Sequence, residues 1–190
     1  VGCNAGYFLI GSQMRGMGAC TGVDAGAYGE PIEFLNDTLK TNVTFLQSSY
    51  NSWTHEVPGL DPHDIVIASA IIQHVSDPLY FLSFLGKTAK KALFLFTGMG
   101  DSDEYLIYYT EPNRFYTDKP FPVGFDNDVG VSRGLLMKSL DMLGFNKIIE
   151  LPWQEDWLPR SWKTSQRALL CLRTDASNDG EKEASVTPPL

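Results

Sequence analysis

The chain has 190 residues, enough for one domain with a sizeable hydrophobic core. Its composition is 43% hydrophobic and 20% charged, as in ordinary globular proteins. No apolar run reaches the ~18 residues of a membrane span, so no membrane association is expected. The net charge of -8 argues against a broad nucleic-acid surface but leaves room for a local basic groove.

The cysteines favour a reducing compartment. Cys3, Cys20 and Cys171 contain no closely spaced pair, and their odd number does not suit a disulfide framework. No basic segment followed by an apolar segment marks a signal peptide. These features favour a cytoplasmic location.

Hydrophobic periodicity predicts an alternation of strands and helices. The predicted helices are residues 5–17, 29–40, 78–90 and 132–143, the last with Ser132 as its N-cap and Gly144 at its end. The predicted strands are the strand end at residues 1–3 and the runs 19–23, 43–46, 64–68, 92–96, 146–150 and 167–172. This order predicts an α/β fold, a Rossmann-like doubly wound, mostly parallel sheet with a C-terminal antiparallel hairpin.

One domain is expected over residues 1–173. Residues 98–130 interrupt the alternation and are rich in aromatic residues, which predicts an insert on the substrate side of the sheet. Residues 174–190 are small and polar, which predicts a disordered tail.

The first candidate site is a glycine-containing turn between a strand end and a helix. Gly2 and Gly6 flank it, and glycines at such a turn let a ligand approach the backbone. The dinucleotide pattern Gly-x-Gly-x-x-Gly is not met, because Asn4 replaces its second glycine. A tight turn without a ligand is the alternative.

The second candidate is Asp24, about 20 residues after this turn. A carboxylate at that spacing accepts hydrogen bonds from ribose hydroxyls. An aspartate at a strand end also serves as a helix cap or turn residue. The spacing favours the ribose role.

Together, three segments resemble motifs of the class I S-adenosylmethionine (SAM)-dependent methyltransferases. They are residues 1–8, residues 22–24, and residues 64–67 followed by residues 73–78. The form Gly-Cys-Asn-Ala-Gly resembles in particular the group that includes tRNA wobble-uridine (carboxy)methyltransferases and related uncharacterised enzymes. The resemblance covers residues 1–97, and beyond them it is only architectural.

The resemblance implies a seven-stranded fold, here with its first strand truncated, and SAM as the cofactor. The implied cofactor-binding residues are Gly2, Cys3, Asn4 and Gly6 at the methionine part, Asp24 at the ribose, Ala25, Ser48 and Ser49 near the adenine, and Ser69 and Ala70 near the methyl group. Many relatives carry an acidic residue against the adenine amine where this chain has Ser48 and Ser49. They also carry a full strand and an acidic residue before the first glycine, and the sequence given has neither.

His74 is the candidate catalytic base, because a histidine near this position is frequent in the family. Its ordinary pKa of ~6.5 suits it to take a proton from a substrate hydroxyl or amine. The alternative, weighted slightly higher, is a histidine hydrogen-bonded at a helix start. His55 and His63 lack metal-ligand spacing, so no metal site is predicted.

The aromatic insert supplies the candidate substrate residues, Tyr105, Tyr108, Tyr109 and Tyr116. It follows a strand, so it is expected above the carboxyl ends of the sheet, where open α/β sheets bind ligands. The alternative is that these aromatic residues pack on one another as a subsidiary core.

The favoured hypothesis is methyl transfer from SAM to a small-molecule acceptor. One alternative is a tRNA-modifying methyltransferase, and another is an inactive SAM-fold module that binds partners. A NAD enzyme is less favoured because of Asn4. Neither the oligomeric state nor the acceptor follows from the sequence.

Overall fold

The structure, a computed structural model, describes residues 1–51, 53–75, 77–109, 129–152 and 166–174. The helices are α1 (Tyr7–Met14), α2 (Gly29–Leu39), the 3₁₀-helix η1 (Ile72–His74), α3 (Pro78–Thr88) and α4 (Arg133–Met142). The strands are β1 (Thr21–Asp24), β2 (Thr44–Gln47), β3 (His63–Ser69), β4 (Ala89–Gly100), β5 (Ile107–Tyr109), β6 (Val129–Ser132), β7 (Lys147–Leu151) and β8 (Gln166–Leu172).

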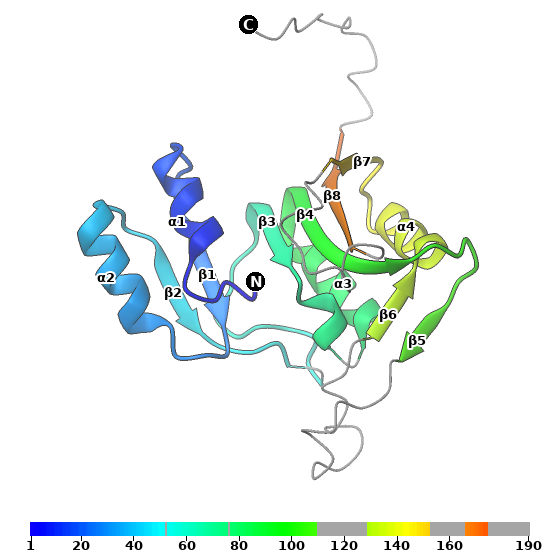
Figure 1. The fold of residues 1–190 in the computed structure, drawn as a ribbon, viewed down its shortest axis with the longest axis horizontal. Coiled ribbons are helices and arrows are strands. Elements are labelled where there is room, and N and C mark those ends of the chain that lie inside the picture. Colours follow the sequence, from blue (N-terminus) through cyan, green and yellow to red (C-terminus); the bar gives the residue numbers. More distant parts are fainter. Residues whose placement is uncertain (52, 76, 110–128, 153–165, 175–190) are drawn as a thin grey trace, which may run out of the picture.

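The strands form two groups that lie side by side in Figure 1. β1 and β2 pair in parallel as a two-stranded sheet, accompanied by α1 and α2. The larger sheet has the order β5-β6-β4-β8-β7, and β3 pairs with β4 in parallel. β8 is antiparallel to both β4 and β7, which confirms the predicted α/β fold with a C-terminal antiparallel hairpin.

Local signals explain several element boundaries. Ser132 caps α4, because its hydroxyl accepts a hydrogen bond from the backbone N–H of Leu135. Gly144 follows that helix in the left-handed region, with φ of 86°, as predicted for a glycine at a helix end. Pro78 is at the start of α3, where its missing N–H removes no helical hydrogen bond.

The expected insert at residues 98–130 is partly regular structure. β4 continues to Gly100, and β5 and β6 pair antiparallel to one another. β5 and β6 are only three and four residues long, too short for a periodic pattern to identify them as strands. Residues 110–128 of this insert lie outside the described part, as do residues 175–190 of the expected tail and residues 153–165 between β7 and β8.

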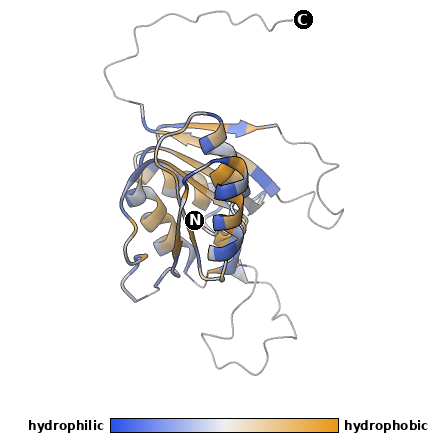
Figure 2. Ribbon diagram, turned by 90° about the vertical axis from the view of Figure 1, so that its left-hand side faces the viewer, coloured by the Kyte–Doolittle hydropathy of each residue, from blue (hydrophilic) through white to orange (hydrophobic). Residues whose placement is uncertain are grey.

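The hydrophobic core has two parts. The larger cluster joins β3, β4, α3, α4 and β8, with Phe81, Leu93 and Leu169 fully buried. A smaller cluster around Ile10, Ile32 and Val43 holds α1 and α2 to β1 and β2. In Figure 2 the hydrophobic (orange) parts of the ribbon lie along the strands and on parts of the helices. No helix in the described ranges is long and apolar enough to cross a membrane.

Candidate cofactor-binding site

The turn that leads into α1 has the backbone that its glycines predict. Gly2, Asn4 and Gly6 have φ of 65°, 49° and 86°, a region that favours glycine and tolerates asparagine. A Cβ on Gly2 would lie 2.6 Å from Cδ1 of Ile71, so the absence of a side chain lets the turn meet the loop after β3. The position of Gly2 in the glycine turn predicted a place for it in the site, but no feature of the sequence indicated its contact with Ile71.

The N-terminus of α1 has open hydrogen-bond donors. Gly6 is its N-cap and supplies no side-chain acceptor, and the first turn of the helix contains no acidic residue. The first N–H groups of a helix have no partner within the helix, and they carry partial positive charge. They therefore favour an anionic group, such as a carboxylate, at this end of α1.

Asp24 ties three segments together at the end of β1. Its Oδ2 accepts a hydrogen bond from the N–H of Asn4 at 2.8 Å, and its Oδ1 accepts one from the N–H of Gly26 at 2.9 Å. Its backbone carbonyl accepts from the N–H of Ser48, also at 2.9 Å. Hydrogen bonds thus join Asp24 directly to Asn4 and Ser48.

Gly26 is a partner of Asp24 that sequence reasoning missed. Aspartate side chains often accept from the backbone N–H two residues later, and this local preference was the available signal. A carboxylate has about four lone-pair positions. With two of them bonded to backbone N–H groups, Asp24 keeps acceptor capacity for a ligand.

The loop after β3 contains the other predicted cofactor-binding residues. Ser69 ends β3, and Ala70 has φ of 53°, a left-handed conformation that costs about 1–3 kcal/mol for such a residue. The N–H of Ala70 donates to the carbonyl of Phe96 at 2.7 Å, which holds this strained residue against β4. His74 follows in η1 with an exposed side chain.

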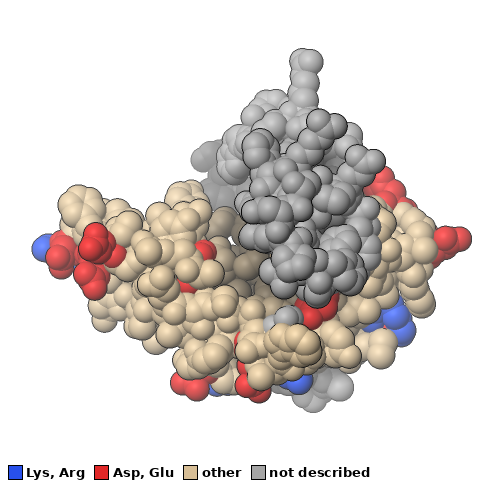
Figure 3. Space-filling model, turned by 90° about the horizontal axis from the view of Figure 1, so that it is seen from below, with Lys and Arg blue, Asp and Glu red and all other residues tan. Residues whose placement is uncertain are grey.

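These segments meet at one edge because β1, β2 and β3 end on the same side of the molecule. That edge faces downward in Figure 1 and toward the viewer in Figure 3. The described atoms on the face in Figure 3 show scattered acidic residues and no cluster of Lys and Arg. This edge is where open α/β sheets bind their ligands.

Two of the predicted substrate tyrosines belong to the larger sheet or to the segment that leads into it: Tyr108 is in β5, and Tyr105 precedes β5. Tyr105 is 65% exposed, and the ring of Tyr108 lies on two glycines, since a Cβ on Gly130 would stand 1.7 Å from its Cε2. Burial, with a smaller effect of Asp101, raises the pKa of Tyr108. The side chain of Tyr109 and the whole of Tyr116 are outside the described part of the chain. No contact between described residues joins Tyr105 or Tyr108 to Asn4, Asp24 or Ser48.

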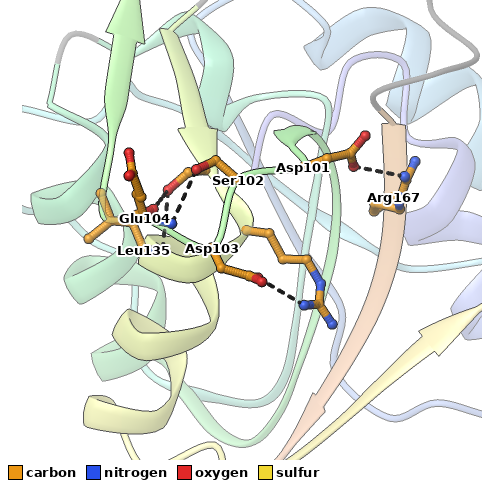
Figure 4. A network of polar contacts seen from close by, with 8 residues as sticks. Asp101, Ser102, Asp103, Glu104, Leu135 and Arg167 are labelled. Carbon is orange, nitrogen blue, oxygen red and sulfur yellow. Dashed lines mark hydrogen bonds and ion pairs between the residues drawn. The ribbon is translucent and has the colours of Figure 1, made fainter.

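Polar contacts hold the segment after β4 in place. Figure 4 shows Asp101 directed toward Arg167 of β8, with 3.2 Å between Oδ1 and Nη2. Asp103 pairs with Arg133 of α4, also at 3.2 Å. The Ser132 hydroxyl accepts from the N–H of Leu106 and donates to the carbonyl of Glu104. The chain that leads to the tyrosines is therefore bound to both α4 and β8.

A second cluster of titratable residues was not predicted. The Tyr50 hydroxyl lies 3.1 Å from Nδ1 of His55, whose ring stacks on Tyr80 with 4.0 Å between ring centres. Burial, then the charge of Asp77, then Tyr80 raise the pKa of Tyr50 to about 12. Burial also raises the pKa of Asp77, while His55 acts to lower it. The contacts depend on the tertiary fold, so no local pattern signalled them. Nowhere in the described ranges do His, Cys, Asp and Glu form a group that could hold a metal ion.

Comparison with known proteins gives relatives by structure alone. No family model matches the sequence, and no curated protein matches it. The N-terminal domain of EvdMO1 with S-adenosylhomocysteine (SAH) bound is 16% identical, with a TM-score of 0.68, covering 91% of this chain and 72% of that one.

Two further solved structures are similar. Magnesium protoporphyrin IX methyltransferase (ChlM) from Synechocystis with bound SAM is 16% identical, with a TM-score of 0.58, covering 91% of this chain and 67% of that one. A putative SAM-dependent methyltransferase from Listeria monocytogenes is 12% identical, with a TM-score of 0.59, covering 92% of this chain and 88% of that one. This chain therefore has the Rossmann-like fold that these methyltransferases share.

Proposed function

We propose that this chain is the catalytic domain of a SAM-dependent methyltransferase that acts on a small-molecule acceptor. The observation that carries the proposal is the hydrogen-bonded junction of Asn4, Asp24 and Ser48 at the carboxyl edge of the sheet. It stands on a fold shared with proteins whose structures contain SAM or SAH.

The groups at this edge fit the polar parts of SAM. The open N–H groups at the start of α1 match the carboxylate of the methionine part. The remaining acceptor positions of Asp24 match the ribose hydroxyls. Ala25 and Ser49 are exposed beside Asp24 and Ser48, where the adenine would lie in this proposal.

SAM supplies a methyl group on a sulfonium, which an acceptor atom takes by in-line displacement. The protein then has to align the acceptor, and a base is needed only for an acceptor that must lose a proton. In this proposal Gly2 and Gly6 shape the turn around the methionine part, with Cys3 between Gly2 and Asn4. Ser69 and Ala70 border the reacting side, and His74 takes the proton.

Charge favours a small molecule over tRNA as the acceptor. The chain carries a net charge of -8, and the face in Figure 3 shows no basic cluster among its described atoms. One structural relative is named a magnesium protoporphyrin IX methyltransferase, and another an O-methyltransferase family protein from Burkholderia thailandensis. Support for the tRNA alternative comes only from the form of the glycine turn, and no observation favours an inactive module.

Calorimetric titration with SAH tests the cofactor, with NAD as the control ligand. Saturable binding of SAH alone is expected. Binding of NAD in its place, or of neither ligand by a folded chain, would reject the cofactor assignment.

Radiolabelled SAM then tests the acceptor class. The labelled methyl group is expected in small phenols, carboxylic acids or amines offered as a panel, and absent from bulk tRNA. Label found in tRNA would overturn the small-molecule assignment. His74→Ala is expected to keep SAH affinity within about threefold and to lower turnover on a labelled acceptor, whereas full turnover would exclude the proton-accepting role.

A further inference from the structure

Two serines of the candidate cofactor site follow β2 directly, and the second has free backbone groups. The N–H of Ser48 donates to the carbonyl of Asp24 at 2.9 Å. Ser49 is exposed, and neither its N–H nor its carbonyl makes a hydrogen bond to another described residue. A free peptide group offers one donor and one acceptor. Adenine presents the matching pair, because its amine donates and the ring nitrogen beside that amine accepts.

Tyr50, the next residue, is anchored on α3. Its ring meets that of Phe81 edge to face, with 5.0 Å between ring centres, and lies 5.5 Å from that of Phe84. Its hydroxyl lies 3.1 Å from Nδ1 of His55. Burial, the largest influence, raises the pKa of Tyr50 to about 12, so the hydroxyl keeps its proton and can donate to a ring nitrogen. Both chain neighbours of Ser49 are thus fixed.

His55 is itself held by its backbone and by its ring. Its φ of 55° lies in the left-handed region, where histidine is enriched among residues other than glycine. Its N–H donates to the carbonyl of Asn51 at 2.7 Å, and the N–H of Asn51 donates to the carbonyl of Glu56 at 2.8 Å. Its ring stacks on that of Tyr80, with 4.0 Å between ring centres and 6° between ring planes. Strained conformations of this kind persist where the surroundings impose them, and they cluster at ligand sites.

We propose that the hydrogen bond between Tyr50 and His55 holds Ser49 in position to recognise the adenine of the cofactor. Tyr50 and His55 are then positioning residues, because they act on the ligand through Ser49. The inference rests on the proposed function, since it requires SAM to bind at this edge of the sheet. It adds the part of the chain that selects adenine over other purines.

Calorimetry with SAH and with S-inosylhomocysteine, in which a carbonyl replaces the adenine amine, tests this selection. The unmodified chain should bind SAH more tightly by about tenfold or more, because the replacement sets one acceptor against another. Tyr50→Phe removes the hydroxyl and keeps the ring against Phe81 and Phe84. It should weaken SAH binding about three- to tenfold, as expected for one neutral hydrogen bond, and leave the affinity for S-inosylhomocysteine within about twofold.

Thr88→Val is the control for a loss of stability alone. It removes a buried hydroxyl that donates to the carbonyl of Phe84 at 2.9 Å, at the C-terminal end of α3. This variant should lower Tm and change neither affinity.

A conservative variant tests the acceptor at position 55. His55→Asn keeps an acceptor close to the place of Nδ1 and tolerates the left-handed backbone, whereas His55→Ala does neither. His55→Asn should therefore bind SAH about threefold more tightly than His55→Ala. Equal affinities of the two variants would overturn the role of the His55 ring nitrogen.

Hydrogen exchange of the ligand-free chain gives a readout that needs no cofactor. The amide of Ser48 should exchange about threefold faster or more in Tyr50→Phe, because its segment is then anchored less firmly. An SAH affinity that Tyr50→Phe leaves within about twofold would overturn the inference, and SAH binding itself would leave the proposed function standing. Equal affinity of the unmodified chain for the two compounds would also overturn the inference. A folded chain that binds neither compound would reject the proposed function and the inference with it.

Discussion

Replacement of Asp24 by alanine removes the acceptor at the centre of the candidate site. The carboxylate accepts from Asn4 and Gly26 at 2.8 and 2.9 Å, and Asp24 is partly exposed. At about 1 kcal/mol for each such bond, the free energy of unfolding should fall by about 1–2 kcal/mol. Loss of the proposed ribose bond to a charged acceptor is worth a further ~1.5–3 kcal/mol of binding energy. At 1.4 kcal/mol per factor of ten, SAH affinity should fall by about 10- to 100-fold.

Calorimetry with SAH and thermal unfolding measure the two effects separately. Asp24→Asn keeps the shape and one acceptor oxygen, so both of its losses should be smaller than those of Asp24→Ala. Asp37→Ala removes an exposed acidic residue from α2, away from the junction, and serves as the matched control with no expected change. A Kd for Asp24→Ala within threefold of the unmodified chain, with a lowered Tm, would reduce Asp24 to an anchor of the turn. An unchanged Tm as well would refute the whole reasoning.

Three further predictions concern the rest of the described structure. Gly134→Ala should lower the free energy of unfolding by about 1–3 kcal/mol, because the added Cβ would lie 2.0 Å from the backbone oxygen of Asp103. Urea denaturation measures this loss. Gly18→Ala is the control, because no atom lies within 4 Å of a Cβ at Gly18. Burial raises the pKa of Asp77 in the folded state above 3.8, so the folded chain loses stability as the pH rises through that pKa. Asp77→Asn should therefore be more stable than the unmodified chain at pH 7, and the difference should vanish below about pH 3.8. A variant less stable than the unmodified chain at pH 7 would contradict this. Cys171 is fully buried, and burial raises its pKa to about 12. A thiol reagent should therefore modify Cys171 only after denaturation. Rapid reaction in the native chain would instead show that β8 opens.

The position of Asp24 at a strand end was predictable because its signal is local. The spacing of Asp24 after the glycine turn placed it at the correct strand end, and the structure joins it to Asn4 and Ser48. Ile71 against Gly2 is a contact between residues far apart in the chain, which no spacing rule encodes. The roles of His74 and of the tyrosines stay predictions, because no described contact links them to Asp24.

The ends of β4 also separate what local sequence signals predict from what contacts between distant segments decide. The predicted strand at residues 92–96 is β4, which extends to Ala89–Gly100. Lys90, Lys91 and three of the last four residues carry no apolar signal of a buried strand. β4 nevertheless continues because β8 and β6 supply hydrogen-bond partners along it, down to Gly100 opposite Ser132. Pairing between distant segments therefore decided its length.

The sequence by itself determined the α/β class, the position of the glycine turn and the order of the helices and strands other than β5 and β6. Those properties follow from capping residues, glycine backbone freedom and hydrophobic period, which act over a few residues. Only the tertiary structure decided that Asp77 lies near His55 and Tyr50 and that Tyr108 lies on Gly130. Each of these depends on packing between segments whose separation along the chain carries no local signal.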